Sequence, residues 1–161
     1  MAESGERKDP YNVARFTVEL EGKAIGIHRV SGLRRTTEVL LVREGGESHG
    51  SRPSPGLTKN KPILLERAKT DDATFEDWAA LVGGRQGGEK PFRRPVRIVL
   101  LDESGKPGLA YDVSGCWPSK YVAFVALNAN QNHVVVERLL LEHEGWVQDR
   151  KANPGPAPQP Q

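Results

Sequence analysis

The residues of this chain most able to do chemistry are four histidines and a single cysteine, namely His28, His49, His133, His143 and Cys116. Their spacing matches no metal-ligand pattern, and one cysteine can form neither an internal disulfide nor a multi-cysteine metal site. A glutamate flanks His143 on each side, but adjacent strand residues point to opposite faces, so these three side chains do not converge simply. We expect Cys116 to be a small buried hydrophobe rather than a reactive thiol.

Two further groups could carry chemistry, and both have simpler structural explanations. Asp71 and Asp72 could form a carboxylate pair, but capping of the helix that follows explains them more simply. Arg93 and Arg94 beside Phe92 could bind phosphate, but so short a basic run at a strand entrance is more often solvated charge. Motifs of serine hydrolases, zinc proteases, P-loops and dinucleotide-binding loops are absent. The sequence therefore predicts no catalytic, cofactor-binding or metal-binding residues, and no enzyme.

Length and composition indicate one soluble domain rich in turns. The 161 residues are enough for a single core, and 17 glycines with 12 prolines favour β structure. With 23 Lys and Arg against 21 Asp and Glu, the net charge predicts no strong attraction for nucleic acid or for a membrane. No run approaches the roughly 20 apolar residues that span a bilayer, and the N-terminus has no signal-peptide core. We expect the chain to be cytoplasmic when it is made.

The N-terminal half begins with a predicted hairpin. Residues 13–21 alternate cleanly, with Phe16 and Val18 on the apolar face, and a turn leads to a second strand over 24–28. A third strand is predicted over 35–44, and both of its faces mix apolar with polar residues. Residues 45–56 then read as a long loop without an apolar anchor, and loops of this length are usually functional or disordered.

The next part of the chain holds the single predicted helix and a second hairpin. A short strand over 62–67 precedes an apolar stripe of helical period that includes Trp78 and ends at a pair of glycines. Strands over 95–101 and 109–117 flank turn residues, which predicts the second hairpin. Trp117 lies on its inner face, and Pro118 is expected to break the pairing.

The last strand is predicted over 132–146, and again neither face is purely apolar. Val134, Val136 and Arg138 share one side of it with Leu140. Such a strand suits a wall that has a core on one side and water or another protein on the other. From residue 149 onward the apolar signal stops, and the proline-rich end predicts a disordered tail. The predicted domains are a flexible segment over 1–9, one β domain over 10–148, and the tail over 149–161.

Short motifs in order along most of the chain give a resemblance to a known family. They are Asp9-Pro10-Tyr11, Ser31-Gly32-Leu33, Thr37-Glu38-Val39, Arg43-Glu44-Gly45-Gly46, Pro55-Gly56, Leu101-Asp102-Glu103, Trp117-Pro118-Ser119-Lys120-Tyr121, Leu127-Asn128-Ala129 and Leu141-Glu142-His143-Glu144-Gly145. Their order resembles the tail-tube proteins of contractile phages and of phage-tail-like contractile injection systems. No single motif is specific, and the signal lies in their order from Asp9 to Trp146.

The resemblance implies a mainly β (α+β) fold, a small antiparallel β-barrel or sandwich with two long hairpins and one flanking α-helix. It implies homo-hexameric rings that stack into an inner tube, with a sheath protein, baseplate hub proteins and a tape-measure protein or cargo as partners, and no membrane binding by the isolated subunit. The implied inter-subunit loop comprises Arg43, Glu44, Gly45, Gly46, Glu47, Ser48, His49, Pro55 and Gly56. The implied tube-wall positions are Thr37, Val39, Leu41, Val134, Val136, Arg138 and Leu140, and the implied core holds Phe16, Val18, Trp78 and Trp117.

Two other interpretations stay open at this point. Departures from the family pattern, such as Ala68 and the proline-rich ending, fit a tube initiator beside the baseplate hub. A protein of another class, a monomeric ligand-binding β-barrel, would use its mixed strand faces to line a cavity.

Overall fold

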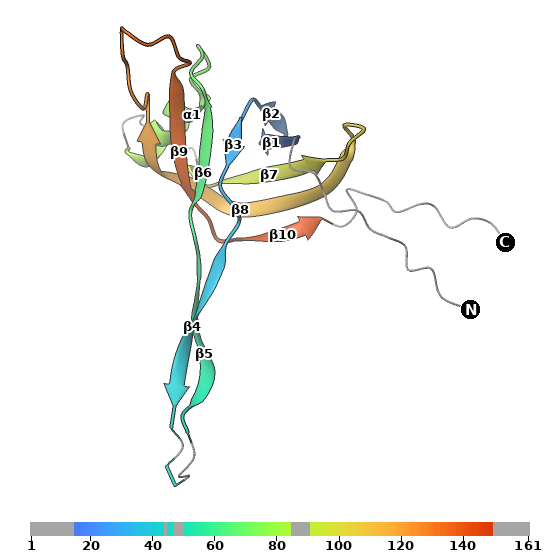
Figure 1. The fold of residues 1–161 in the computed structure, drawn as a ribbon, viewed down its shortest axis with the longest axis vertical. Coiled ribbons are helices and arrows are strands. Elements are labelled where there is room, and N and C mark those ends of the chain that lie inside the picture. The colour runs from blue at the N-terminus through green and yellow to red at the C-terminus, as the bar shows by residue number, and fades with distance from the viewer. Residues whose placement is uncertain (1–14, 44, 47–49, 85–90, 150–161) are drawn as a thin grey trace, which may run out of the picture.

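A computed structural model describes residues 15–43, 45–46, 50–84 and 91–149 of the chain (Figure 1). The predicted segment 1–9, the predicted tail 149–161 apart from Asp149, and the beginning of the first predicted strand lie outside these residues. The elements in chain order are β1 (Phe16–Leu20), β2 (Lys23–Ile25), β3 (Arg29–Val30), β4 (Arg35–Val42), β5 (Arg52–Asn60), β6 (Ile63–Ala68), α1 (Thr74–Val82), β7 (Arg94–Leu101), β8 (Pro107–Val122), β9 (Val136–Glu142) and β10 (Gly145–Asp149). The fold is mainly β with antiparallel pairing, as predicted.

The strand β8 organises the body of the molecule. Its first part pairs with β7 along one edge, while β10 and then β9 follow each other along the opposite edge. The main sheet runs in the order β2-β1-β7-β8-β9-β6-β3, with β10 beside β8. This path does not close on itself, so the strands form an open, strongly curved sheet rather than a sealed barrel (Figure 1).

Glycines with positive φ lie at the corner where β8 changes partners. Gly115 has φ 62° and Gly145 has φ 129°, a region that side chains rarely adopt. Ser114 pairs with Gly145, while Trp117 pairs with Glu142, so the corner falls between the two pairings. A bend of this kind lets one long strand belong to both halves of a curved sheet.

The core fills the concave side of this sheet and is covered by α1. Its largest fully buried side chains include Trp78 and Phe75 of α1, with Leu65, Leu139 and Leu141 from β6 and β9. The indole Nε1 of Trp78 donates a hydrogen bond of 2.6 Å to the carbonyl oxygen of Phe92, which ties the helix to the entry of β7. The predicted helix stripe is confirmed, since its apolar face is the one that packs on the sheet.

Of the predicted core residues, three are in place and one is not. Val18 and Trp78 are each 1% exposed, and Phe16 is partly buried against the core. Trp117 lies outside the core cluster, and its ring centroid is 6.4 Å from that of Phe92, with the two rings nearly perpendicular. The cause is the corner at Gly115, which interrupts the alternation along β8: Val113 and Cys116 both point inward, and Trp117 therefore points outward.

Three predicted boundaries were wrong. The strand predicted over 132–146 is two strands, β9 and β10, separated by a break at residues 143–144. Val134 lies in the loop before β9 and is 69% exposed. β8 continues through Pro118 to Val122, because a register shift between Pro118 and Lys120 absorbs the proline. The loop predicted over 45–56 is shorter than expected, because its C-terminal residues begin β5.

Candidate functional surfaces

The most distinctive surface is the two-stranded hairpin of β4 and β5, which projects away from the body (Figure 1). The two strands pair only with each other, and every residue of β4 is exposed. Thr37 and Thr58 share a hydrogen bond of 2.8 Å across the ribbon, and Lys59 Nζ lies 3.3 Å from the carboxylate of Glu38. These polar contacts help to hold the ribbon together but cover little of it.

Large apolar side chains are exposed on both faces of this hairpin. The exposed fractions are 69% for Val39, 51% for Leu40, 68% for Leu41, 45% for Val42 and 61% for Leu57. A lone two-stranded ribbon is at best marginally stable in water, and contiguous exposed apolar surface marks an interaction site. The hairpin is therefore built to be covered by another protein surface.

The residues predicted for an inter-subunit loop divide between the tip and the shaft of this hairpin. Arg43, Gly45 and Gly46 lie at the tip, while Glu44, Glu47, Ser48 and His49 are outside the described residues. Pro55 and Gly56 belong to β5, which corrects their assignment to a loop. A Cβ on Gly56 would lie 3.0 Å from Leu40 Cγ, so the glycine allows a close approach of the two strands.

The predicted tube-wall residues do not form one surface. Thr37, Val39 and Leu41 lie on β4 of the hairpin, whereas Val136, Arg138 and Leu140 lie on β9 of the main sheet. On β9 they share the convex face of the sheet, because the intervening Glu137, Leu139 and Leu141 are fully buried on the core side. We call the convex face of β6, β9 and the end of β8 the outer sheet face.

The outer sheet face carries a paired cluster of charges. Glu66 is only 4% exposed, and Arg138 Nε donates to it at 2.5 Å while Arg29 Nη1 donates at 3.4 Å. Burial alone would raise the pKa of Glu66, but the hydrogen bonds and charges of Arg138 and Arg29 hold it below its ordinary value. His28 Nε2 lies 3.9 Å from the same carboxylate. The cluster keeps Glu66 ionised on this surface.

Both lateral edges of this face are open within the described part of the chain. β3 is the end strand of the sheet, and no described strand pairs with the edge of β8 opposite β9 beyond Cys116. Unpaired strand edges are templates for pairing with another chain. The outer sheet face can therefore be extended on either side by a neighbouring sheet.

On the core side of the same strands lies a buried ionic network that sequence patterns did not indicate. Glu137 is 0% exposed and accepts hydrogen bonds from Arg67 Nε at 2.5 Å, Tyr121 Oη at 2.9 Å and Lys69 Nζ at 3.0 Å. Arg67 also donates to the carboxylate of Asp72 at 2.9 Å, and its guanidinium stacks 4.1 Å over the Phe75 ring. The network joins the sheet to the loop that leads into α1. No local sequence motif could have indicated it, because its residues are too far apart in the sequence.

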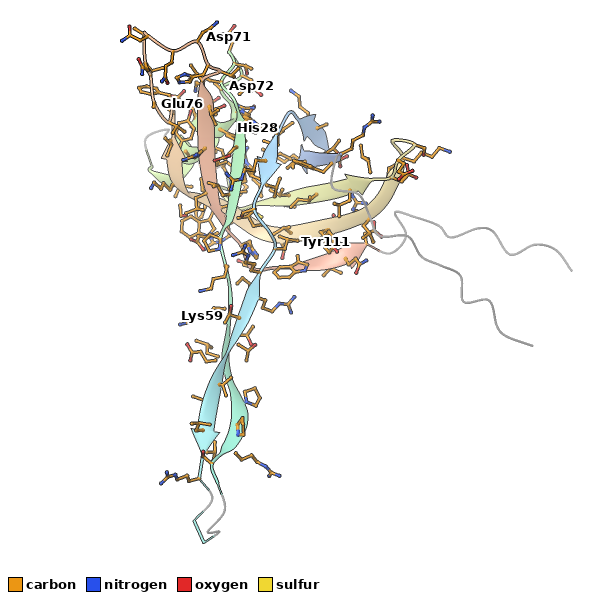
Figure 2. All side chains as sticks on the ribbon, in the orientation of Figure 1. His28, Lys59, Asp71, Asp72, Glu76 and Tyr111 are labelled. Carbon is orange, nitrogen blue, oxygen red and sulfur yellow. The ribbon has the colours of Figure 1, made fainter. Side chains whose placement is uncertain are left out.

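The end of the body opposite the hairpin is acidic, as the labelled side chains of Figure 2 show. Asp71, Asp72 and Glu76 gather there, in the loop before α1 and in its first turn. Hydrogen bonds from Thr74, and then the Arg67 guanidinium, lower the pKa of Asp72 to about 2. Asp72 thus has a structural role, because it accepts hydrogen bonds from Thr74 and Arg67. Asp71 and Glu76 are exposed.

A cavity of about 450 Å³ opens at the root of the hairpin, between β1, β7, β8 and the chain from β3 to β4. Apolar side chains dominate its lining, which includes Phe16, Leu33, Ile98, Leu100, Tyr111 and Trp146. The open sheet order shows that this cavity is not the interior of a sealed ligand-binding barrel.

Within the described part of the chain, the histidines and the cysteine that the sequence singled out do not gather into one site, and His49 lies outside it. Among the described residues, no three His, Cys, Asp or Glu side chains gather as a metal site would require. Cys116 is fully buried, as predicted, and burial raises the pKa of its thiol to about 12. No described helix is long and apolar enough to cross a bilayer.

The described residues define a class of protein by their fold and surfaces. They form an open antiparallel β structure with free sheet edges and a projecting apolar hairpin, which is the form of an assembly subunit. Residues 12–147 match the sequence profile described as T4-like virus tail tube protein gp19, and the chain belongs to this family of tail tube proteins. The structure supports the resemblance seen in the sequence motifs. No curated protein matches the chain in a direct comparison.

Solved structures share the fold at low sequence identity. A chain of the six-fold symmetrised anti-feeding prophage baseplate is 23% identical, with a TM-score of 0.73 over 88% of this chain and 96% of that one. A chain of the PVC extracellular contractile injection system sheath–tube complex is 20% identical, with a TM-score of 0.72 over 87% and 91%. Hcp1 from Flavobacterium johnsoniae is 13% identical, with a TM-score of 0.54 over 83% and 93%.

Proposed function

We propose that this tail tube protein forms six-membered rings, that the rings stack, and that the β4–β5 hairpin makes the contact between them. The observation that carries the proposal is the hairpin itself, whose large apolar side chains are exposed on both faces. Burying apolar surface stabilises an assembly by about 25 cal/mol per Å², so covering this ribbon is a strong drive to associate.

Within one ring, the outer sheet faces join edge to edge and line a central channel. The open edges of β3 and β8 supply the backbone groups for such pairing, and a closed ring leaves no edge exposed. Val136, Arg138 and Leu140 then face the channel, together with the Glu66 cluster. Thr37, Val39 and Leu41 serve the contact between rings rather than the channel wall.

The stacked rings act as a rigid, non-enzymatic conduit. The structures with this fold include a sheath–tube complex and a baseplate, which supports a sheath protein around the tube and baseplate hub proteins at one end. A tape-measure protein or cargo occupies the channel. The subunit is made in the cytoplasm and needs no membrane of its own to assemble.

The test replaces the apolar surface of the hairpin and follows assembly. In the variant Val39→Ser with Leu41→Ser, we expect rings of hexameric mass in analytical ultracentrifugation but no tubes in negative-stain images. Val147→Ser is the matched control, because Val147 is 71% exposed on the body rather than on the hairpin. Tubes of ordinary length from the double variant, or equal loss in the control, would overturn the role of the hairpin.

A further inference from the structure

The cavity at the root of the hairpin is lined by aromatic side chains from three strands. They are Phe16 of β1, Tyr111 of β8 and Trp146 of β10, and the volume of the cavity is about 450 Å³. Pockets that bind ligands measure about 300–1,000 Å³ and combine apolar walls with a few polar groups. Within the described part of the chain, neither the Tyr111 hydroxyl nor the Trp146 indole N–H makes a hydrogen bond. The cavity therefore combines aromatic surface with two available donors.

The segment that follows β10 has the composition of a polyproline ligand. Residues 154–161 read Pro-Gly-Pro-Ala-Pro-Gln-Pro-Gln and include no charged side chain. The match to the family profile ends at residue 147, so this segment is not part of the pattern that defines the family. Proline-rich sequences favour the extended polyproline II conformation, in which the backbone carbonyls have no internal partner. Such segments bind in aromatic-lined grooves, because their preformed conformation loses little entropy on docking.

We propose that the proline-rich segment 154–161 docks into the cavity of its own subunit. The observation behind it is the position of β10, whose Trp146 lines the cavity and whose last residue, Asp149, leads directly into this segment. The prolines pack against the rings of Tyr111 and Trp146, and carbonyl oxygens of the segment accept hydrogen bonds from the hydroxyl and the indole N–H. The sequence by itself predicts a disordered tail, because such a segment has no apolar surface of its own to bury. The cavity supplies that surface.

The length of the segment permits docking within one subunit. Gln148 pairs with Tyr111, so the wall of the cavity lies one residue before the end of β10 (Figure 2). Asn153-Pro154-Gly155 has the residue types of a chain-reversing turn. Residues 150–153 span at most about 14 Å when fully extended, and residues 156–160 span about 16 Å in the polyproline II conformation. A chain that reverses at this turn therefore returns its last prolines to Tyr111.

Docking covers apolar surface that the free subunit otherwise presents to water. Leu33, Ile98 and Leu100 complete the walls of the cavity, and exposed apolar patches promote association with other surfaces. A segment tethered by a short linker has an effective concentration of about 1 mM, so a contact with a Kd of about 1 mM is formed about half of the time. The segment can therefore protect the cavity without binding tightly. This role goes beyond the part that the subunit plays in a tube.

The test uses the full chain with a fluorescent reporter in the segment. Ala157→Cys is labelled with bimane, a dye that tryptophan quenches on contact, while the fully buried Cys116 stays unlabelled in the folded protein. We expect about half the fluorescence of the same labelled chain carrying Trp146→Phe, which keeps an aromatic ring but removes the quencher. Trp117→Phe is the matched control, because Trp117 does not line this cavity. It should leave the quenching unchanged.

Further variants test the cavity without changing a tryptophan. Gly32 lines the cavity, and a Cβ there would meet no atom closer than 3.7 Å. Gly32→Leu should therefore fill the cavity and restore the fluorescence. Gly26→Leu adds the same side chain where a Cβ meets nothing within 4 Å, and it should leave the quenching in place. Serine at the three proline positions 156, 158 and 160 should also restore the fluorescence, because it removes the preformed conformation.

Two results would overturn the proposal. Equal fluorescence of the labelled chain with and without Trp146→Phe would show that the segment does not occupy the cavity. Quenching that appears when the labelled Trp146→Phe chain is mixed with unlabelled, unmodified protein would show that the segment binds the cavity of another copy. Both measurements can be made whether or not the protein forms rings, so their outcome is separate from that of the proposed function.

Discussion

Neutralising Glu137 should remove much of the stability of the subunit. Glu137 is 0% exposed and accepts hydrogen bonds from Arg67, Lys69 and Tyr121. The side chain of Arg67 is 4% exposed. In Glu137→Gln its guanidinium keeps the ion pair with Asp72 but loses the one with the buried carboxylate of residue 137. Removing one partner of a buried ion pair costs about 3–5 kcal/mol. We expect a loss at the lower end, about 3 kcal/mol, because Arg67 still pairs with Asp72 and the amide oxygen of Gln can still accept a hydrogen bond.

Glu66→Gln is the matched comparison on the neighbouring strand. Glu66 is also buried, but its partners Arg138 and Arg29 have side chains 41% and 65% exposed. Those cations can turn to water when the carboxylate is neutralised, so we expect a loss of about 1 kcal/mol. The assay is urea unfolding of each protein at one protein concentration, followed by tryptophan fluorescence. A loss of 3 kcal/mol lowers the urea midpoint by about 1–2 M at ordinary slopes.

The stability of the unmodified protein and that of Glu137→Gln should depend differently on pH. Burial would raise the pKa of Glu137, but the hydrogen bonds of Arg67, Lys69 and Tyr121 prevail and hold it below its ordinary value of 4.5. A depressed folded-state pKa contributes stability above the unfolded value, and that stability is lost as the pH falls through the folded value. The difference in unfolding free energy between the unmodified protein and Glu137→Gln should therefore stay constant down to about pH 4.5 and shrink as the pH falls further. A Glu137→Gln protein within about 0.5 kcal/mol of the unmodified one would refute this account of the network.

Two further predictions concern the corner of β8 and the buried thiol. Gly115→Ala should destabilise by about 1–2 kcal/mol, because φ is 62° there, in the left-handed region that a Cβ disfavours. Thermal unfolding checks it against Gly26→Ala, whose Cβ meets nothing within 4 Å, and equal stability of the two variants would contradict it. Cys116 should react with iodoacetamide only after unfolding in urea, since its thiol is buried with a pKa of about 12; rapid labelling of folded rings would show that reasoning to be wrong.

Local alternation predicts the regular elements well. The period-two pattern around Val18 and the helical stripe through Trp78 both correspond to elements of the structure. Their apolar faces are the buried faces, because a half-buried strand or helix must place apolar residues at its own period. The mixed faces of the last strand were also informative, since its outer side holds the Glu66 cluster with Arg138.

Prolines misled the prediction for the hairpin. Pro53 and Pro55 pair with Leu41 and Val39 in β5, although such residues suggested a loop. Nitrogens two residues apart in a strand point to the same side, so both prolines can face the open side of the ribbon, where no ladder hydrogen bond is lost. Only the pairing of β5 with β4 reveals this, and that pairing depends on tertiary structure.

The buried network and the corner could not be predicted for a related reason. Glu137 meets Arg67 and Lys69 across 70 and 68 residues of sequence, a separation at which local patterns carry no signal. The reversal at Trp117 depends on the positive φ of Gly115, because one residue outside the β region shifts every later side chain to the other face.

Images of the purified chain at high concentration test the central claim most directly. Electron cryo-microscopy should show six-membered rings, and tubes in which the β4–β5 ribbon of each copy is buried against the next ring. A monomer whose ribbon stays exposed to solvent at every concentration would contradict the account.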